Sequence, residues 1–189
     1  MSGLRGAPSR IRAALILLVF FLCLFGTVRW WGRLFFPLSY WPLIEAESGR
    51  HRLDPLLILA IIREESAFDP KAISSRGARG LMQVMPETGA WIAARLGEEF
   101  MLGRLFVPAD NIRFGTWYLA ALLAEFQGDL TRSLVAYNAG GNKVRAWLAE
   151  GTWDGSLAAL DRLPYKETRR YVIKIIRSYR IYRFLYQEP

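Results

Sequence analysis

A glutamate at the end of a strongly apolar segment is the residue in this chain best placed to do chemistry. Residues 55–62 (PLLILAII) are apolar throughout and lead directly into Arg63, Glu64 and Glu65. The segment predicts a helix that is too apolar to face water. A carboxylate at the carboxyl end of such a helix is disfavoured in its charged form by burial and by the helix dipole. The pKa of Glu65 should therefore rise toward the range that a general acid needs.

A simpler interpretation of the same segment is that the two glutamates only mark the point where the helix leaves the core. Two downstream segments favour a site instead. Residues 77–83 (GARGLMQ) and 136–140 (AYNAG) bring polar side chains and glycines into otherwise apolar surroundings. Glycine allows a backbone to approach closely, and Tyr137 and Asn138 are a polar pair between two alanines.

Several classes of chemistry are excluded by composition. His51 is the only histidine and Cys23 the only cysteine, so a histidine or cysteine metal site, a nucleophilic triad and an intrachain disulfide all lack their residues. No glycine-rich phosphate loop is present, which leaves nucleotide chemistry without a binding motif. We expect no cofactor and no metal.

A glycosidase normally places two carboxylates on either side of the sugar bond. Glu64 cannot be the partner of Glu65, because adjacent positions of a helix point about 100° apart. Asp69, Glu87 and Glu167 remain, but none lies in a segment as apolar as the one before Glu65. The sequence therefore favours a mechanism with one acid.

The pattern of apolar residues predicts an all-α, mainly helical domain with at most a small β element. Asp54-Pro55 is a helix start and Asp69-Pro70 a helix stop, while the segment 71–80 (KAISSRGARG) reads as a loop that lines a cleft. The other expected helices cover residues 42–51, 86–96, 108–127, 130–138, 142–150 and 164–186.

The N-terminus predicts a membrane anchor. Residues 13–28 carry no charge and are flanked by arginines and by the pair Trp30-Trp31. We divide the chain into a basic cytoplasmic N-terminus (1–12), a transmembrane helix (13–31), a juxtamembrane connector (32–41) and a catalytic domain (42–187). A cleaved signal peptide is the alternative, but no small-residue cleavage site follows the apolar stretch. Three arginines before the span and two after it favour an N-terminus inside and a domain outside the cell membrane.

The net charge of +8 is concentrated at the two ends of the chain. The first 33 residues hold five arginines and no acid, which leaves 20 basic against 17 acidic residues for the remainder. The stretch 162–183 is rich in lysine and arginine, which could attract nucleic acid, anionic lipid or an anionic polymer. A solvated helix face explains it more simply, and an outside location argues against nucleic acid.

Four motifs in order resemble the soluble lytic murein transglycosylase family. They are residues 65–70 (ESAFDP), 80–86 (GLMQVMP), 136–140 (AYNAG) and 167–172 (ETRRYV). The resemblance runs from about Tyr40 to Tyr186 and implies a goose-type lysozyme-like fold that binds peptidoglycan glycan strands. The chain departs from the family at Gly141, Asn142 and Lys166, where prolines and a glycine are common, which affects details of the subsites.

The resemblance also implies roles for residues. Glu65, directly before serine, is the implied single acid and base, which cleaves the bond between N-acetylmuramic acid and N-acetylglucosamine and leaves a 1,6-anhydro ring. The implied substrate contacts are Ser66, Ser74, Gln83, Met85, Tyr137, Asn138, Glu167 and Tyr171. Core packing is an equal interpretation of Met85. The alternative functions are a muramidase that hydrolyses the same bond and a non-catalytic module that binds peptidoglycan.

Overall fold

The computed structural model describes residues 9–187, and the chain divides into two compact units, Met1–Pro37 and Leu38–Pro189. The first unit holds a single helix, α1 (Ser9–Phe35). Between Ile11 and Phe35 this helix has a mean hydropathy of 2.5 and is long enough to cross a membrane. By length and composition it is a candidate membrane span, and it extends past both ends of the span predicted from the sequence.

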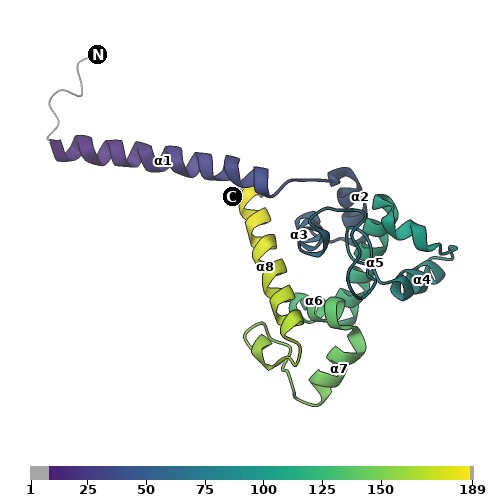
Figure 1. Cartoon of the computed structure of the whole chain (residues 1–189). Helices are drawn as coiled ribbons and strands as arrows, with labels where there is room; N and C mark the ends of the chain where they lie inside the picture. Colours follow the sequence, from purple (N-terminus) through teal and green to yellow (C-terminus); the bar gives the residue numbers. More distant parts are fainter. Residues whose placement is uncertain (1–8, 188–189) are drawn as a thin grey trace. The chain divides into compact units, whose positions relative to one another are not determined.

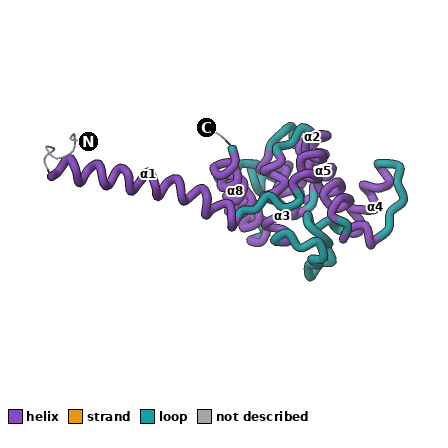
Figure 2. The backbone as a smooth tube through the Cα atoms, turned by 90° about the horizontal axis from the view of Figure 1, so that it is seen from above, coloured by secondary structure: helices purple, strands orange, loops and turns teal. Residues whose placement is uncertain are grey.

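The second unit is helical (Figures 1 and 2). No strand occurs among its described residues, and two isolated bridges, Ile73 to Arg79 and Arg79 to Val84, are its β structure. The predicted all-α class is confirmed. The α-helices are α2 (Trp41–His51), α3 (Pro55–Ser66), α4 (Pro86–Arg95), α5 (Pro108–Glu125), α6 (Leu130–Ala139), α7 (Gly141–Ala149) and α8 (Lys166–Tyr186), and the short 3-10 helices are η1 (Leu102–Phe106) and η2 (Leu160–Arg162).

Helix α3 is the centre of the second unit. It starts where the sequence predicts, with the Asp54 carboxylate accepting a hydrogen bond of 2.8 Å from the backbone N–H of Leu56. Every residue from Leu56 to Ile62 is buried, and α3 packs against α2 and α8. Each large apolar side chain buried in this way contributes roughly 1.5–3 kcal/mol to the stability of the unit.

The end of α3 differs from the prediction. The helix ends at Ser66 rather than at Asp69-Pro70. Ala67 and Phe68 adopt left-handed backbone conformations, with φ of 49° and 68°, and turn the chain away from the helix axis. Alanine and phenylalanine rarely adopt this conformation, so no residue type in the sequence signals the turn.

The segment 71–84 wraps back toward the end of α3 and is held there by Asn111 of α5. The buried Asn111 amide accepts a hydrogen bond of 2.7 Å from the N–H of Met82 and donates to the carbonyl oxygens of Arg79 (2.8 Å) and Leu105 (2.7 Å). Gly80 has a φ of 75°, and a side chain there would collide with the Leu105 carbonyl and the Asn111 amide. Asn111 and Gly80 therefore help to fix the conformation of the loop.

Helix α8 forms one edge of this unit and α4 lies toward the opposite edge (Figures 1 and 2). One side of α8, its inner row, is buried. The inner row consists of Tyr171, Ile175, Ser178, Tyr182 and Leu185. The spacing of four and three residues keeps these side chains on one face of the helix, and that face packs against α3.

Replacing Asn111 with alanine should destabilise the protein strongly. The change removes three hydrogen bonds and leaves the N–H of Met82 and two carbonyls without their partner in the interior. We expect a loss of about 2–4 kcal/mol in the free energy of unfolding, measured by denaturant titration of the full chain in detergent. Met101→Ala, at a side chain that is 62% exposed, is the control and should change it by less than about 0.5 kcal/mol. Equal effects of the two variants would contradict this account of the loop.

Candidate active site

The carboxyl of Glu65 lines a small cavity of about 160 Å³ at the end of α3. The cavity is formed by the end of α3, the loop 74–85, the end of α6 and the start of α8. Its lining residues are Glu65, Ser74, Ser75, Arg76, Ala78, Gln83, Met85, Tyr137, Asn138 and Glu167. Of the nine residues proposed from the sequence, seven line this cavity, and Ser66 and Tyr171 do not.

Burial raises the pKa of Glu65 from 4.5 to about 7. The cause is loss of hydration of the charged form, and an interaction with the Tyr171 hydroxyl opposes it more weakly. At neutral pH a large fraction of this carboxyl therefore keeps its proton. The group can donate a proton in one step and accept one in the next, which is what an acid–base catalyst needs.

Two tyrosines lie beside the Glu65 carboxyl. The Tyr171 hydroxyl is buried and has no hydrogen bond of ordinary geometry, although its interaction with Glu65 affects the pKa of both groups. The Tyr137 hydroxyl donates a hydrogen bond of 2.9 Å to the carbonyl of Met82. Burial and the nearby Glu65 raise the pKa of Tyr137 well above its ordinary value, so this hydroxyl stays protonated as a donor.

Several of the residues proposed as sugar contacts also hold the cavity wall. Ser66 lies close to the Ile62 and Leu81 carbonyls, at 3.1 Å and 2.9 Å, and joins the last turn of α3 to the loop. The Ser74 hydroxyl accepts from the N–H of Ala78 at 3.0 Å. The side-chain nitrogen of Gln83 donates to two carbonyls of the same loop, at 2.9 Å and 3.2 Å. These bonds shape the loop that faces Glu65.

Helix α8 joins the opposite walls of the cavity. The Thr168 hydroxyl donates to the Asn138 side chain at 2.8 Å, which links α8 to α6. Glu167 forms an ion pair of 2.8 Å with Arg76 of the loop. Both of these charged side chains are mostly exposed, so the pair lies at the rim of the cavity and has little value for stability.

Glu64 points away from the cavity. Its carboxylate accepts a hydrogen bond from the Ser178 hydroxyl of the inner row. Glu64 and Glu65 therefore have different surroundings, as the 100° step between adjacent helix positions predicts. The interpretation that both glutamates only mark the exit of the helix to solvent does not fit Glu65.

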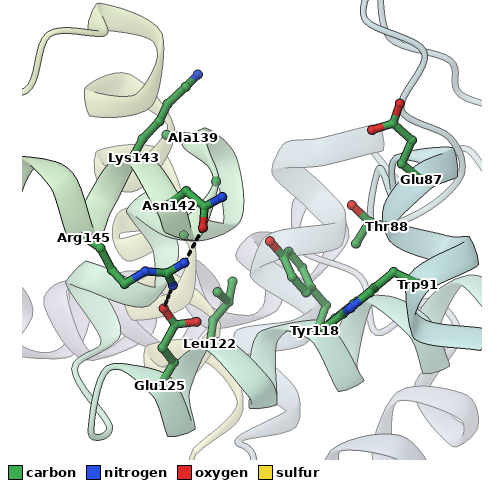
Figure 3. Close-up of a pocket in the computed structure, with 12 residues that line it drawn as sticks. Glu87, Thr88, Trp91, Tyr118, Leu122, Glu125, Ala139, Asn142, Lys143 and Arg145 are labelled. Atoms are coloured by element: carbon green, nitrogen blue, oxygen red, sulfur yellow. Dashed lines mark hydrogen bonds and ion pairs between the residues drawn. The ribbon is translucent and has the colours of Figure 1, made fainter. Parts of the chain in front are cut away.

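A second and larger cavity, of about 650 Å³, lies between α4 and α7 (Figure 3). Trp91 and Tyr118 face it from α4 and α5, and Arg145 pairs with Glu125 and Asn142 on its other side. Adjoining stretches of the chain line the two cavities. The chain from Tyr137 to Asn142 passes from one to the other, and so does the segment from Met85 to Thr88.

The ring of Tyr118, which lines the larger cavity, contacts that of Tyr137, which lines the smaller one, with centroids 5.4 Å apart. Aromatic rings such as Trp91 and Tyr118 offer flat apolar faces beside polar groups. Glu65 lies in the smaller of these two cavities. Two hollows lined by adjoining stretches of the chain offer space for successive units of a polymer.

Sequence reasoning missed several residues of the site. Arg76 gave no signal, because an exposed arginine in a glycine-rich loop looks like a solvated charge. Asn111 could have been found as a polar residue facing inward on an apolar helix. Trp91 and Tyr118 gave no signal of a site, because helical spacing does not tell a groove from an interior.

Comparison with known proteins identifies the family. The pattern of the transglycosylase SLT domain matches residues 42–157, more than half of the chain. The chain belongs to the transglycosylase SLT domain family. The likeness inferred from the four sequence motifs is thereby confirmed.

Relatives within the SLT family include soluble and membrane-bound proteins. The soluble lytic murein transglycosylase of Escherichia coli (strain K12) is 36% identical over 157 residues, which cover 79% of this chain and 24% of that protein. The membrane-bound lytic murein transglycosylase C of Actinobacillus pleuropneumoniae serotype 5b is 40% identical over 116 residues, or 56% of this chain and 32% of that protein. The chain thus spans about a quarter to a third of the length of these relatives.

The SLT fold is also seen in a solved structure. The crystal structure of an inactive glutamate-to-glutamine variant of lytic transglycosylase Slt from Pseudomonas aeruginosa matches with a TM-score of 0.71 and 34% identity. The match covers 79% of this chain and 24% of that one.

The raised pKa of Glu65 predicts a stability difference that depends on pH. The folded state binds this proton more tightly than the unfolded chain, so its stabilising effect is complete below about pH 4.5 and is lost as pH rises through about 7. Glu65→Gln removes the charge and should raise the stability relative to the parent by on the order of 1–3 kcal/mol at about pH 8.

Thermal melting of both proteins across this pH range measures the difference. We expect the gain in Tm from Glu65→Gln to shrink as pH falls and to vanish near pH 4.5. A gain that is the same at all pH values would show that the carboxyl is not held in a shielded cavity.

Proposed function

We propose that this protein is a lytic transglycosylase that cleaves the bond between N-acetylmuramic acid and N-acetylglucosamine in peptidoglycan. The observation that carries the proposal is the buried Glu65 carboxyl, whose pKa burial raises to about 7 and which lines a cavity beside a second, larger one. Membership of the SLT family supports it, because its relatives bear the name of lytic murein transglycosylases.

In the proposed mechanism Glu65 serves first as acid and then as base. Its proton goes to the glycosidic oxygen as the bond from that oxygen to the muramoyl C1 breaks. The carboxylate then takes the proton of the muramoyl C6 hydroxyl, whose oxygen forms a bond to C1 and closes the 1,6-anhydro ring. No water is consumed, and Glu65 ends in its starting state.

The surroundings of Glu65 support a single acid. Glu167 is the other carboxylate lining the cavity, and it is exposed and paired with Arg76. The Tyr171 hydroxyl is placed to stabilise the ionised form of Glu65 between the two steps. The N-acetyl group of the substrate would supply the remaining assistance at C1, as in other substrate-assisted cases. Ser74, Gln83, Met85, Tyr137 and Asn138 would contact the sugars.

Product analysis on purified peptidoglycan tests this function. The full chain in detergent should release 1,6-anhydromuropeptides, identified by mass spectrometry. Glu65→Gln should lower the rate by roughly 10²–10⁴-fold, because it removes the acid and base. Glu64→Gln is the matched control and should keep most of the activity, since its amide oxygen can still accept from Ser178.

The alternatives give different products in the same assay. Products with reducing ends only would identify a muramidase that hydrolyses the bond. Retention on peptidoglycan without any release would identify a non-catalytic binding module. Full activity of Glu65→Gln would place the acid elsewhere.

We also propose that α1 anchors the protein in the cell membrane, with the N-terminus inside and the SLT domain outside. The apolar helix from Ile11 to Phe35 and the arginines before it support this topology. Protease added to intact spheroplasts should digest the domain and leave a protected fragment of about the length of the anchor. Protection of the whole chain would reverse the orientation.

A further inference from the structure

The outward side of α8 carries a second row of residues with the same spacing as the inner row. This outer row consists of Lys166, Arg170, Ile173, Arg177, Arg180 and Phe184, and all six are exposed. Their separations alternate between four and three residues, so they lie on one face of the helix, roughly opposite the inner row. The row spans about 27 Å at ~1.5 Å per residue.

The outer row is strongly cationic. Four of its six members are lysine or arginine, and none is acidic. Within the described part of the chain, none of these four basic side chains takes part in an ion pair. Their charges are therefore available to an external anionic partner.

The outer row is also apolar at two points. Ile173 is 55% exposed near its middle and Phe184 is 46% exposed near its end. Beside the row lies a cavity of about 480 Å³ whose other wall is the segment from Leu157 to Asp161. Leu157 adds a further exposed apolar side chain, and Ile176 and Leu160 line the floor.

We propose that the outer row is a membrane-docking surface that lies on anionic lipid headgroups, with Ile173, Phe184 and Leu157 inserted at the boundary with the acyl chains. A helix with basic and apolar residues on one exposed face has the composition of an interfacial helix. A soluble anionic polymer would bind the arginines without needing the apolar residues between them.

The length of the connector supports this choice of partner, and here the inference rests on the proposed anchoring by α1. Two residues, Phe36 and Pro37, separate the end of α1 from the second unit. At ~3.3–3.6 Å per residue the connector spans at most about 10 Å. If α1 crosses the membrane, the domain stays within reach of lipid headgroups, and a weak surface interaction becomes effectively intramolecular.

Docking through the outer row would leave the candidate active site uncovered. Tyr171, which lies beside Glu65, belongs to the inner row on the opposite face of the same helix. Lipid contact along the outer row would therefore leave Tyr171 and its contact with Glu65 on the side of α8 that faces the core.

Fluorescence quenching by brominated lipids tests the proposal on the full chain in nanodiscs. A fluorophore is attached at Ile173→Cys in a Cys23→Ser background, because Cys23 is the only cysteine. We expect strong quenching in discs with anionic lipid and little in discs with zwitterionic lipid. Arg177→Gln with Arg180→Gln should reduce the ratio of docked to undocked domain by about fivefold for each arginine. A fluorophore at Met101→Cys, exposed in the loop after α4, is the control and should remain unquenched.

Other outcomes would overturn the proposal. Equal quenching in both kinds of disc would rule out the anionic headgroups as the partner, and no quenching in either would rule out the lipid surface. If the Ile173 label becomes shielded from a water-soluble quencher only after peptidoglycan fragments are added, the row binds the wall polymer. If this shielding depends on the number of chains per disc, the row binds a second copy of the chain. Release of the chain from discs at high salt would contradict the anchoring by α1, and with it the docking proposal that rests on this anchoring.

Product release is measured in the same discs. Loss of 1,6-anhydro products with quenching retained would contradict the enzymatic function alone. Loss of quenching with products retained would contradict docking alone.

Discussion

The shielding of one carboxyl from water is the constraint on which the candidate site depends. A glutamate titrates near pH 7 only if the structure around it excludes solvent without supplying a strong positive partner. Helix α3 meets half of this requirement, because its apolar residues sit in the core and place Glu65 at the boundary of the interior. The left-handed turn at Ala67 and Phe68 then directs the chain away from the helix axis. The Glu65 carboxyl therefore lies next to a cavity rather than next to another turn of helix.

The other half of the shielding comes from a loop that is held by its own hydrogen bonds and by neighbouring helices. The segment 71–84 contains two isolated bridges but no helix or strand, and side chains from three helices also bond to its backbone: Asn111 from α5, Ser66 from α3 and Tyr137 from α6. Each of these helices is thereby connected to the wall that faces Glu65. Residues proposed as sugar contacts and residues that hold the wall are in part the same, so a change in one of them would alter the shape of the cavity as well.

Much of this arrangement could be predicted from the sequence, for physical reasons that differ between elements. The apolar run of α3 and the Asp54-Pro55 start are strong local signals, and they placed Glu65 correctly at the end of a buried helix. The four motifs indicated which segments meet, and the structure brings their residues together around one cavity.

What could not be predicted depends on contacts between distant residues. The predicted end of α3 was wrong by three residues. The left-handed backbone conformations of Ala67 and Phe68 are determined by the surrounding fold and not by local preference. The bonds of Asn111 and the pair of Arg76 with Glu167 join residues that are far apart in the sequence, and the groove between Trp91 and Arg145 depends on the packing of α4 against α5.

Because α8 carries two separate rows of residues, its two sides can change in amino-acid sequence independently of each other. A substitution on the inner row would disturb Tyr171 or the contacts with α3, and so would change the surroundings of Glu65. A substitution among the arginines of the outer row touches none of these contacts. The outer face of α8 can therefore diverge in sequence over evolutionary time while the surroundings of Glu65 stay the same.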